Sequence, residues 1–408
     1  MAKAKREKPL VAIVNGLLNP IPPVKAGGPQ LVIWNTCKHL SSDVFDWLVL
    51  SKWDDALTDV PYDAEKFYQM RIGERELRMS RLAQKLPYRL VKAWYGVVRP
   101  DHLALNLAMV RELKCLQPDV VIVHESYSMC FMIARALPKA KIVYYHHGCR
   151  MDLDLNEKTW NRLLKSAKSG IVGLSHKGFD LVDAKFHMTP RRKWVIINGA
   201  DDELLESGLS SSEEVNKKQF RFVYVGRLHS HKGLENLLEA FDIVLNRKKQ
   251  ARLSFIGSGK ADEDGDFSYE GKLKAKAGKI SVDSIQFYGF LPNTELVHIY
   301  PEYDCAVLVS ELPEGNPLFL IEALTMGLPV IATSMGGVPE VVRDGLDGIL
   351  LEDGVSPAKL AEAMISMIDN REKWDAGREE RIASARDRFD YRRVARQLEE
   401  VILEVLNG

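Results

Sequence analysis

The sequence predicts an α/β protein with two doubly wound, Rossmann-like domains. Its 408 residues are enough for two or three domains at roughly 100–200 residues each. Apolar residues make up 46% and charged residues 27%, as in a soluble globular protein. Short runs rich in Val and Ile alternate with amphipathic segments almost from end to end. Repeated units of one strand and one helix predict right-handed crossovers and doubly wound parallel sheets.

About six strands are expected in each half, because the apolar runs do not alternate with polar residues and so indicate parallel strands covered on both faces. In the first half they are Leu10–Val14, Trp47–Leu50, Asp119–Val123, Lys141–Tyr145, Gly170–Leu174 and Trp194–Ile197. In the second half they are Phe220–Val225, Arg252–Ile256, Ser284–Tyr288, Cys305–Val309, Pro329–Ala332 and Gly348–Leu351. The helices between them include Gln30–Leu40, Leu103–Leu116, Glu157–Ala167, Leu234–Val244, Pro317–Met326 and Pro357–Ile368.

The break between the domains is expected where Asp, Glu, Ser and Asn dominate and no apolar period survives. We therefore expect an N-terminal domain over residues 1–200, a linker over 201–218 and a C-terminal domain over 219–385. The remaining residues, 386–408, contain a helix at Tyr391–Leu406 that is a candidate to pack back on the N-terminal domain.

The net charge of zero is a cancellation between the two halves. Residues 1–193 hold 31 Lys and Arg against 19 Asp and Glu, whereas residues 194–408 hold 25 against 37. A basic half indicates an acidic partner, either a membrane surface or a nucleic acid. Because no nucleic-acid-binding module is recognisable, we expect no nucleic acid partner.

The cysteine spacing and the hydropathy argue against zinc-knuckle, redox-motif, membrane-spanning and secreted proteins. The five cysteines are odd in number, and no pair has the two-residue spacing of a zinc knuckle or a redox motif. No apolar stretch approaches the ~18–20 residues of a membrane span, and the basic N-terminus is not followed by a secretory signal. We therefore expect reduced thiols in a cytoplasmic protein, with peripheral attachment to the inner face of the membrane as an open alternative.

Candidate ligand-binding residues follow the predicted strands, because doubly wound sheets bind ligands at the carboxyl ends of their strands. Gly27 and Gly28 precede the first helix, where backbone amides can approach a phosphate or a sugar, although a plain flexible turn explains them equally well. The segment from Gly226 to Gly233 places Arg227 and Lys232 at a second strand end. A guanidinium fork and an ammonium suit a diphosphate, and the alternative is a solvated basic loop.

The third segment places two carboxylates eight positions apart across a helix start, at Glu314 and Glu322. Asn316 can cap this helix, and Pro317 fits its first position. No Lys or Arg occurs between Lys279 and Arg343, so both acids lack basic partners nearby in sequence. Such acids bind hydroxyl groups or cations from elsewhere, and a sugar supplies hydroxyl groups. An acid favoured by the helix dipole is the alternative for Glu314.

These motifs together resemble the retaining glycosyltransferases of family 4, over nearly the whole chain. The block from Glu314 to Glu322 resembles the family's E-x7-E motif, and the following segment 327–340 resembles its G-x-P-V-x-A-T…G-G-x-P-E run. The segments 226–233 and 198–201 resemble the family's G-R-L…K-G and N-G-V-D elements. The resemblance implies the GT-B fold, in which two Rossmann-like domains face each other across a cleft.

The resemblance also implies roles for single residues. Arg227 and Lys232 would bind the donor's diphosphate, Glu322 the nucleotide ribose and Glu314 the transferred sugar. His124 matches the position at which the family places a histidine beside the reacting sugar. The expected catalytic residues are His124, Glu314, Arg227 and Lys232. The expected donor-binding residues are Gly27, Gly28, Gly226, Arg227, Lys232, Glu314, Gly315, Asn316, Pro317, Leu318 and Glu322.

The acceptor side departs from the family pattern. Pro29 follows the glycine pair and Trp34 lies in the helix after it, and His146-His147 doubles a histidine where the family often has one. We take His147 and Pro29 as acceptor-side candidates. Short Asp-x-Asp patterns at Asp152–Asp154 and within Asp262–Asp266 could indicate a metal-dependent transferase, but neither has the strand-end placement of a metal site. We expect no metal site, no cofactor and metal-independent activity.

A basic stripe in the first half is a candidate membrane contact. Seven cations recur at intervals of three or four, the spacing of one helical face: Arg71, Arg75, Arg78, Arg81, Lys85, Arg89 and Lys92. Leucines and aromatic residues lie among them, and Pro87 is expected to divide or kink the helix. The stripe indicates either docking on an anionic membrane or a solvated face over a core helix.

The sequence thus predicts a retaining hexosyltransferase that uses a UDP- or GDP-sugar. The resemblance implies a glycan or lipid-linked acceptor, as in cell-envelope or lipopolysaccharide biosynthesis. A non-catalytic sugar- or coat-binding protein with the same fold is one alternative, and a same-fold epimerase or phosphorylase is another.

Overall fold

The computed structural model describes residues 6–24, 27–58, 60–95, 100–149, 151, 155–207, 218–259 and 268–408. These residues form two compact units. The N-terminal unit consists of the chain up to Ile196 together with Arg392–Gly408, and the C-terminal unit is Ile197–Tyr391. The division thus falls four residues before the expected end of the first domain. The helix Asp202–Ser207 (α9) occupies the start of the expected linker, and residues 208–217 lie outside the described part.

The N-terminal unit contains a parallel seven-stranded sheet in the order β3-β2-β1-β4-β5-β6-β7. Its strands are β1 (Leu10–Asn15), β2 (Asp46–Lys52), β3 (Phe67–Met70), β4 (Val120–His124), β5 (Lys141–Tyr145), β6 (Gly170–Gly173) and β7 (Lys193–Val195). The six predicted strands are confirmed, with ends that differ by at most two residues. The edge strand β3 has no counterpart among the predicted strands, because its four residues form no apolar run.

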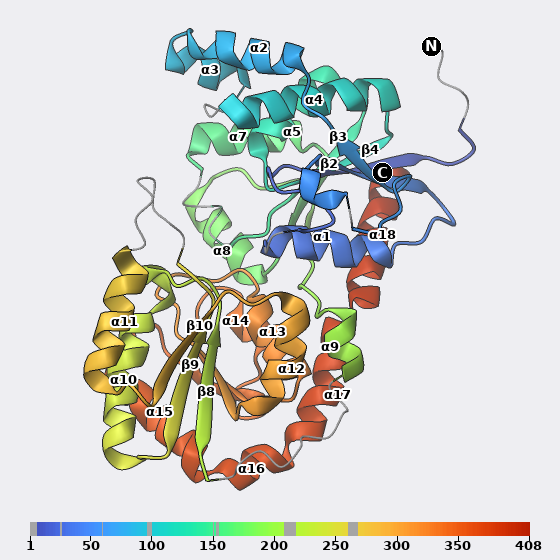
Figure 1. Ribbon diagram of the computed structural model, residues 1–408. Helices are drawn as coiled ribbons and strands as arrows, with labels where there is room; N and C mark the ends of the chain where they lie inside the picture. The colour runs from blue at the N-terminus through green and yellow to red at the C-terminus, as the bar shows by residue number, and fades with distance from the viewer. Residues whose placement is uncertain are drawn as a thin grey trace. The chain divides into compact units, whose positions relative to one another are not determined.

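Helices cover both faces of this sheet. They are α1 (Gly28–Lys38), α2 (Glu74–Gln84), α3 (Tyr88–Tyr95), α4 (Pro100–Leu116), α5 (Tyr127–Ala136), α7 (Glu157–Ser166), α8 (His176–Lys185) and α18 (Tyr391–Asn407), with a 3₁₀ turn η1 at Asp55–Leu57. Figure 1 shows α4, α5 and α7 on one side of the sheet, α1 on the other, and α2 and α3 beyond α4. The side chains of Ser126, Asn156 and Ser175 cap α5, α7 and α8 by accepting a backbone N–H, as N-cap residues do.

The last helix, α18, belongs to the N-terminal unit from Arg392 onward. The Lys141 ammonium donates to the carbonyl oxygens of Val405 and Leu406, at 2.8 and 3.0 Å. A cation is favourable there because the carbonyls of a helix C-terminus carry partial negative charge. Glu404 accepts a hydrogen bond from the Trp194 indole at 2.8 Å, which ties the same helix to the residues of β7.

The C-terminal unit contains a parallel six-stranded sheet in the order β10-β9-β8-β11-β12-β13. Its strands are β8 (Phe220–Val225), β9 (Ala251–Ile256), β10 (Ile285–Gly289), β11 (Cys305–Leu308), β12 (Val330–Thr333) and β13 (Gly348–Leu351). All six correspond to predicted strands. The helices are α9, α10 (Leu234–Arg247), α11 (Ser268–Ile280), α12 (Asn293–Ile299), α13 (Leu318–Thr325), α14 (Val338–Val341), α15 (Pro357–Asp369), α16 (Arg371–Ala376) and α17 (Arg378–Phe389), with 3₁₀ turns η2 (Ser230–Lys232) and η3 (Tyr300–Glu302). In Figure 1, α10, α11 and α15 lie on one side of this sheet and α12 and α13 on the other.

Each sheet has one point at which the strand order reverses. In the N-terminal unit β1 lies between β2 and β4, and in the C-terminal unit β8 lies between β9 and β11. Ligands of doubly wound sheets bind in the crevice at such a point, outside the carboxyl ends of the strands. A ligand site is therefore expected among the residues that follow β1 and β4 and among those that follow β8 and β11.

Candidate functional site

The two predicted motifs of the C-terminal unit meet at its switch point. The loop after β8 carries Lys232, and the loop after β11 carries Glu314. Lys232 Nζ lies 2.5 Å from Glu314 Oε1, and both side chains are only about one-fifth exposed, at 21% and 18%. The Ser310 hydroxyl donates to the same carboxylate oxygen. Glu314 thus does have a basic partner, Lys232, which comes from the loop after the neighbouring strand β8 rather than from the segment of Glu314 itself.

Backbone contacts hold the two loops together at this point. The His231 carbonyl accepts a hydrogen bond from the Glu311 N–H at 2.8 Å. Gly233 has φ +65°, and a Cβ placed on it would lie 2.1 Å from the carbonyl oxygen of Val309. Only glycine combines this left-handed conformation with so close an approach. The glycine therefore fixes Lys232 beside the end of β11.

Arg227 lies on the same loop but is exposed. Its backbone carbonyl accepts a hydrogen bond from the Tyr224 hydroxyl at 2.8 Å, which holds the start of the loop. The preceding residue, Gly226, has φ +152° and donates its N–H to the Ile256 carbonyl. Within the described residues the Arg227 guanidinium makes no side-chain hydrogen bond or ion pair. A fixed loop thus presents an exposed guanidinium and a paired ammonium at the switch point.

The second carboxylate, Glu322, lies inside α13 and is buried. Its Oε2 accepts a hydrogen bond from the Tyr300 hydroxyl at 2.7 Å. Burial raises the pKa of Glu322, and the hydrogen bond from Tyr300 opposes that shift. Burial and the nearby Glu322 charge raise the pKa of Tyr300 well above its ordinary value, so the phenol stays protonated and donates. Tyr300 is absent from the predicted site, since nothing in its sequence neighbourhood marks it.

The start of α13 differs from the expectation. Pro317 is the N-cap residue rather than the first helical residue, and no side chain caps this helix. The prediction that Asn316 caps it is wrong, because its amide is used elsewhere. Asn316 Oδ1 accepts from the Asn198 N–H at 3.0 Å, and Asn198 Nδ2 donates to the Asn316 carbonyl at 3.0 Å. The 198–201 and 314–322 motifs are thereby joined.

The remaining donor-site candidates of the C-terminal unit lie close by in the chain. Gly315 and Pro317 are half-buried, and Leu318 begins α13. The Gly337 N–H donates to the Glu314 carbonyl at 2.8 Å, which brings the glycine pair of segment 327–340 against the same loop.

In the N-terminal unit, the glycine pair begins α1 as expected. Gly27 is the N-cap residue of α1, Gly28 is its first residue, and Pro29 follows in the first turn. The preceding loop also contains Gly16, whose N–H donates to the His124 carbonyl at 3.1 Å. A Cβ on Gly16 would lie 2.3 Å from that carbonyl, so this glycine permits the close approach of β1 to β4. Gly16 is absent from the predicted site.

His124 ends β4, and His147 follows the neighbouring strand β5. Their rings are in contact, with His124 Nδ1 2.7 Å from His147 Nε2, and both stack on Tyr145. Burial lowers the pKa of His124 to about 3. Burial and the neighbouring His124 lower the pKa of His147 well below its ordinary value. Both imidazoles are therefore neutral at physiological pH.

A neutral histidine pair has a definite hydrogen-bonding capacity. One ring donates to the other, so of the two remaining nitrogens, His124 Nε2 and His147 Nδ1, one is a donor and the other an acceptor. Among the described residues, neither of these two atoms has a hydrogen-bond partner. Within the described part of the chain, the pair therefore keeps one unused donor and one unused acceptor, both on buried atoms.

Glu125 is the functional candidate that sequence reasoning missed beside this pair. It has φ +61°, an uncommon conformation for a residue other than glycine, and its carboxylate accepts from the His147 backbone N–H. His146 Nδ1 lies 3.6 Å from the same carboxylate. The signal in the sequence is its position directly after His124, at a strand end.

Three further expectations concern metal clusters, the Asp-x-Asp patterns and membrane-spanning helices. No cluster of three or more His, Cys, Asp or Glu that could hold a metal ion occurs among the described residues. Both Asp-x-Asp patterns, Asp152–Asp154 and Asp262–Asp266, lie outside the described residues. In the described part of the chain, no helix has the length and apolar character needed to cross a membrane.

The basic stripe forms two helices, α2 and α3, with Pro87 between them as predicted. The prediction that Arg71 belongs to this helical face is wrong, because Arg71 precedes α2. Its guanidinium lies 5.1 Å from the Trp53 ring centroid. The other six cations are exposed. Large apolar side chains among them are also exposed: Met79, Leu82, Leu86 and Leu90, at 40–55%.

Comparison with known proteins finds similarity to glycosyltransferases. Residues 209–386 match the family model described as glycosyl transferases group 1. The chain is 23% identical over 301 residues to spore coat protein SA of Bacillus subtilis, covering 71% of this chain and 80% of that protein. It is 30% identical over 217 residues to D-inositol 3-phosphate glycosyltransferase of Corynebacterium glutamicum, covering 51% of each.

Solved structures show the fold of the whole chain. HepE of Anabaena, in complex with UDP-glucose, superposes with a TM-score of 0.72 and 18% identity, covering 97% of this chain and 99% of that one. The two Rossmann-like units therefore form the GT-B fold, as the resemblance implied.

Proposed function

We propose that the protein is a retaining glycosyltransferase that moves a hexose-type sugar from a UDP-sugar to a glycan or lipid-linked acceptor. The observation that carries the proposal is the pairing of Lys232 with Glu314 at the switch point of the C-terminal unit, on the loop that also carries the exposed Arg227. This arrangement places cations for a diphosphate beside a carboxylate for sugar hydroxyl groups. The complex of HepE with UDP-glucose favours UDP over GDP as the nucleotide.

The chemistry follows from where charge develops. As the bond between the anomeric carbon and the diphosphate breaks, negative charge grows on the leaving UDP. Arg227 and Lys232 stabilise that charge more strongly in the transition state than in the ground state, which lowers the barrier. The same two cations supply the positive charge that a divalent metal would provide, so we propose metal-independent turnover. An assay in excess chelator tests this, and activity restored only by manganese would contradict it.

Glu314 and Glu322 have different proposed partners. Glu322 is fixed by Tyr300 through one oxygen, and its other oxygen would bind the ribose hydroxyl groups. Glu314 would exchange Lys232 for the hydroxyl groups of the transferred sugar when the diphosphate takes over the ammonium. Gly226, Gly315, Asn316, Pro317 and Leu318 would line the phosphates and the sugar.

The N-terminal unit would supply the acceptor side. The neutral pair of His124 and His147 offers one donor and one acceptor, which suits hydroxyl groups of the reacting sugar and the acceptor. At the start of α1, Gly27 and Gly28 would provide backbone amides for the donor, and Pro29 would provide a rigid turn on the acceptor side. Retention of the anomeric configuration would follow from attack by the acceptor on the face from which UDP leaves.

The exposed cations and leucines of α2, α3 and the turn between them support a membrane partner. A solvated helix face does not need large exposed apolar side chains among its cations, whereas a helix docked on an anionic membrane uses both. We therefore include peripheral attachment to a membrane with acidic lipids in the proposal, which suits a lipid-linked acceptor.

The experiment that tests the donor assignment is a thermal-shift titration with UDP, GDP and their sugars. A ligand that binds only the folded state raises the melting temperature. We expect UDP to raise it, and the R227A variant to lose most of that shift. Arg247, exposed at the end of α10, provides a matched control in R247A, which should keep the full shift. An unchanged shift in R227A would contradict the diphosphate assignment.

The similarity to spore coat protein SA favours one second candidate, a sugar-binding protein without transferase activity. Hydrolysis and transfer assays separate the two. Binding of UDP-sugars without release of UDP in the presence of oligosaccharide and lipid-linked acceptors would support the second candidate.

A further inference from the structure

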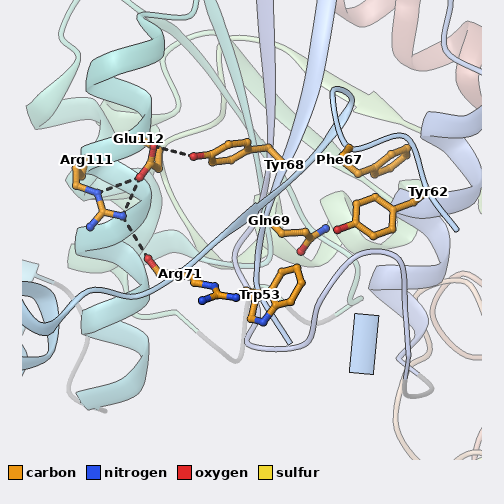
Figure 2. Close-up of a pocket in the computed structure, with 9 residues that line it drawn as sticks. Trp53, Tyr62, Phe67, Tyr68, Gln69, Arg71, Arg111 and Glu112 are labelled. Carbon is orange, nitrogen blue, oxygen red and sulfur yellow. Dashed lines mark hydrogen bonds and ion pairs between the residues drawn. The ribbon is translucent and has the colours of Figure 1, made fainter. Parts of the chain in front are cut away.

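A surface pocket at the edge strand β3 is not used by the proposed transfer chemistry. It has a volume of about 520 Å³, within the range of small-molecule sites. Figure 2 shows its walls, with Tyr68 and Gln69 on β3 and Arg111 and Glu112 on α4. The residues that line it combine aromatic rings with amide, carboxylate and guanidinium groups. Sites with such a mixture bind ligands that have both apolar faces and hydroxyl groups.

Four aromatic residues line the pocket: Trp53, Tyr62, Phe67 and Tyr68. The Trp53 indole is held in place, because its Nε1 donates to Asp55 at 3.0 Å and Arg71 lies over the ring at 5.1 Å. A second cavity of about 310 Å³ shares Trp53 and Arg71 as lining residues. The hollow surface thus continues past Trp53 beyond the first pocket, which suits a chain of sugar units better than a single small ligand.

The polar groups of the pocket are ordered and nearly balanced in charge. Arg111 pairs with Glu76 at 2.7 Å and with Glu112 at 2.8 Å, and it donates to the Arg71 carbonyl. The Tyr68 hydroxyl contacts Glu112 at 3.4 Å. Because the two carboxylates, Glu76 and Glu112, match the two guanidinium groups, Arg71 and Arg111, in number, the site favours a neutral hydroxylated ligand over a phosphate.

Gln69 leaves one polar atom without a partner among the described residues. Its Nε2 donates to the Ile21 carbonyl, which fixes the orientation of the amide. Its Oε1 is buried and accepts no hydrogen bond from any described residue. A buried acceptor without a donor costs free energy, and a ligand hydroxyl group would remove that cost.

The pocket and the histidine pair lie at corresponding heights along the strands of one sheet. Tyr68 is in register with Leu50, Leu50 with Val14, and Val14 with Val123, the residue before His124. Three strand spacings separate β3 from β4, about 14 Å at the usual distance between strands. A ligand of several sugar units could therefore occupy the pocket while its end lies at His124.

We infer that this pocket binds an internal sugar unit of an oligosaccharide acceptor whose terminal unit is glycosylated near His124. The inference rests on the proposed function and names its acceptor class, a neutral oligosaccharide chain. Trp53 and Tyr68 would stack on the apolar faces of the sugar rings, and Gln69 would accept from a hydroxyl group.

The test uses three probes, maltohexaose, cellohexaose and chitohexaose, with binding measured by saturation-transfer NMR on the full chain. We expect at least one hexasaccharide to bind the wild type. W53A and Y68A should raise its Kd at least tenfold or abolish the signal. The matched control is Y288A, because Tyr288 of the C-terminal unit is 50% exposed, close to the 42% of Tyr68. Y288A should leave the Kd unchanged.

Three outcomes would overturn the inference. They are failure of all three hexasaccharides to bind, equal binding by W53A, Y68A and the wild type, and displacement of the sugar by inorganic phosphate. The UDP thermal shift of the same variants separates this inference from the proposed function. We expect W53A and Y68A to keep that shift, whereas a wild type without any UDP shift would refute the proposed function independently of the hexasaccharide result.

Discussion

Lys232 and Glu314, 82 positions apart in the chain, form an ion pair 2.5 Å long at the switch point of the C-terminal sheet. Each side chain is partly exposed, so a ligand can reach both groups. The pair neutralises the charge of the Glu314 carboxylate at the ends of the strands. It also holds the Lys232 ammonium in place before a diphosphate binds. On ligand binding, the contact between Lys232 and Glu314 would be replaced by two contacts. Lys232 would bind the diphosphate, and Glu314 would bind the sugar hydroxyl groups.

Replacing Lys232 should weaken UDP more than UMP. The K232M variant loses a hydrogen bond between charged groups, worth about 1.5–3 kcal/mol, which corresponds to roughly a 10–150-fold loss of affinity. UMP lacks the second phosphate, so its affinity should change much less. Calorimetric titration with both nucleotides measures the difference. The matched control is K276M, which breaks the Lys276–Glu239 pair of the same unit and should affect neither nucleotide.

Replacing Gly233 should damage the stability of the C-terminal unit as well as donor binding. In G233A the new Cβ would lie 2.1 Å from the Val309 carbonyl oxygen, and the residue would keep a positive φ. We expect a loss of more than about 2 kcal/mol in the free energy of unfolding, measured in urea. Gly278 in α11 has no atom within 4 Å of a new Cβ, so G278A should be neutral or stabilising by up to about 1 kcal/mol. Equal stability of G233A and the wild type would contradict this account.

The strands could be predicted because most are buried on both faces and appear in the sequence as unbroken apolar runs. β1 and β4 are buried at every position. β3 could not be predicted, because an edge strand pairs on one side only and its middle residues, Tyr68 and Gln69, are not fully buried. β3 is defined by its pairing with β2, and the residue pattern of the segment itself gives no indication of that pairing.

The site could be predicted as motifs but not as contacts. Lys232 and Glu314 are each identifiable in the sequence, yet their pairing depends on β8 lying beside β11 in the sheet. The contact of His124 with His147 depends in the same way on β4 lying beside β5. A local rule assigns Asn316 to a helix cap, whereas a partner more than 100 positions away, Asn198, takes its amide.

The stability of the N-terminal unit should fall in acid because of His124. Burial lowers its pKa to about 3, whereas an unfolded histidine titrates near 6.5. Between these values the unfolded state binds one more proton than the folded state, so stability rises with pH and is lost as pH falls from 6.5 towards 3. This group alone should contribute a loss of about 3 kcal/mol by about pH 4. Urea unfolding of the H124Q variant should show a flatter dependence on pH over this window, while H187Q, at an exposed histidine, should keep the dependence of the wild type.

The exposed leucines of α2, α3 and the turn between them should determine membrane binding together with the cations. The triple variant L82S/L86S/L90S removes three large apolar side chains that are at least half exposed, each worth about 1.5 kcal/mol or more when buried in lipid. Each cation near an acidic lipid surface adds about 1 kcal/mol, so R78E/K85E should also weaken binding, most strongly at low salt. Co-sedimentation with vesicles of equal phosphatidylglycerol and phosphatidylcholine measures both effects. V282S removes a side chain that is 78% exposed in the C-terminal unit and should bind like the wild type. A wild type that stays in the supernatant at low salt would rule out the membrane partner, and the face would then be a solvated one.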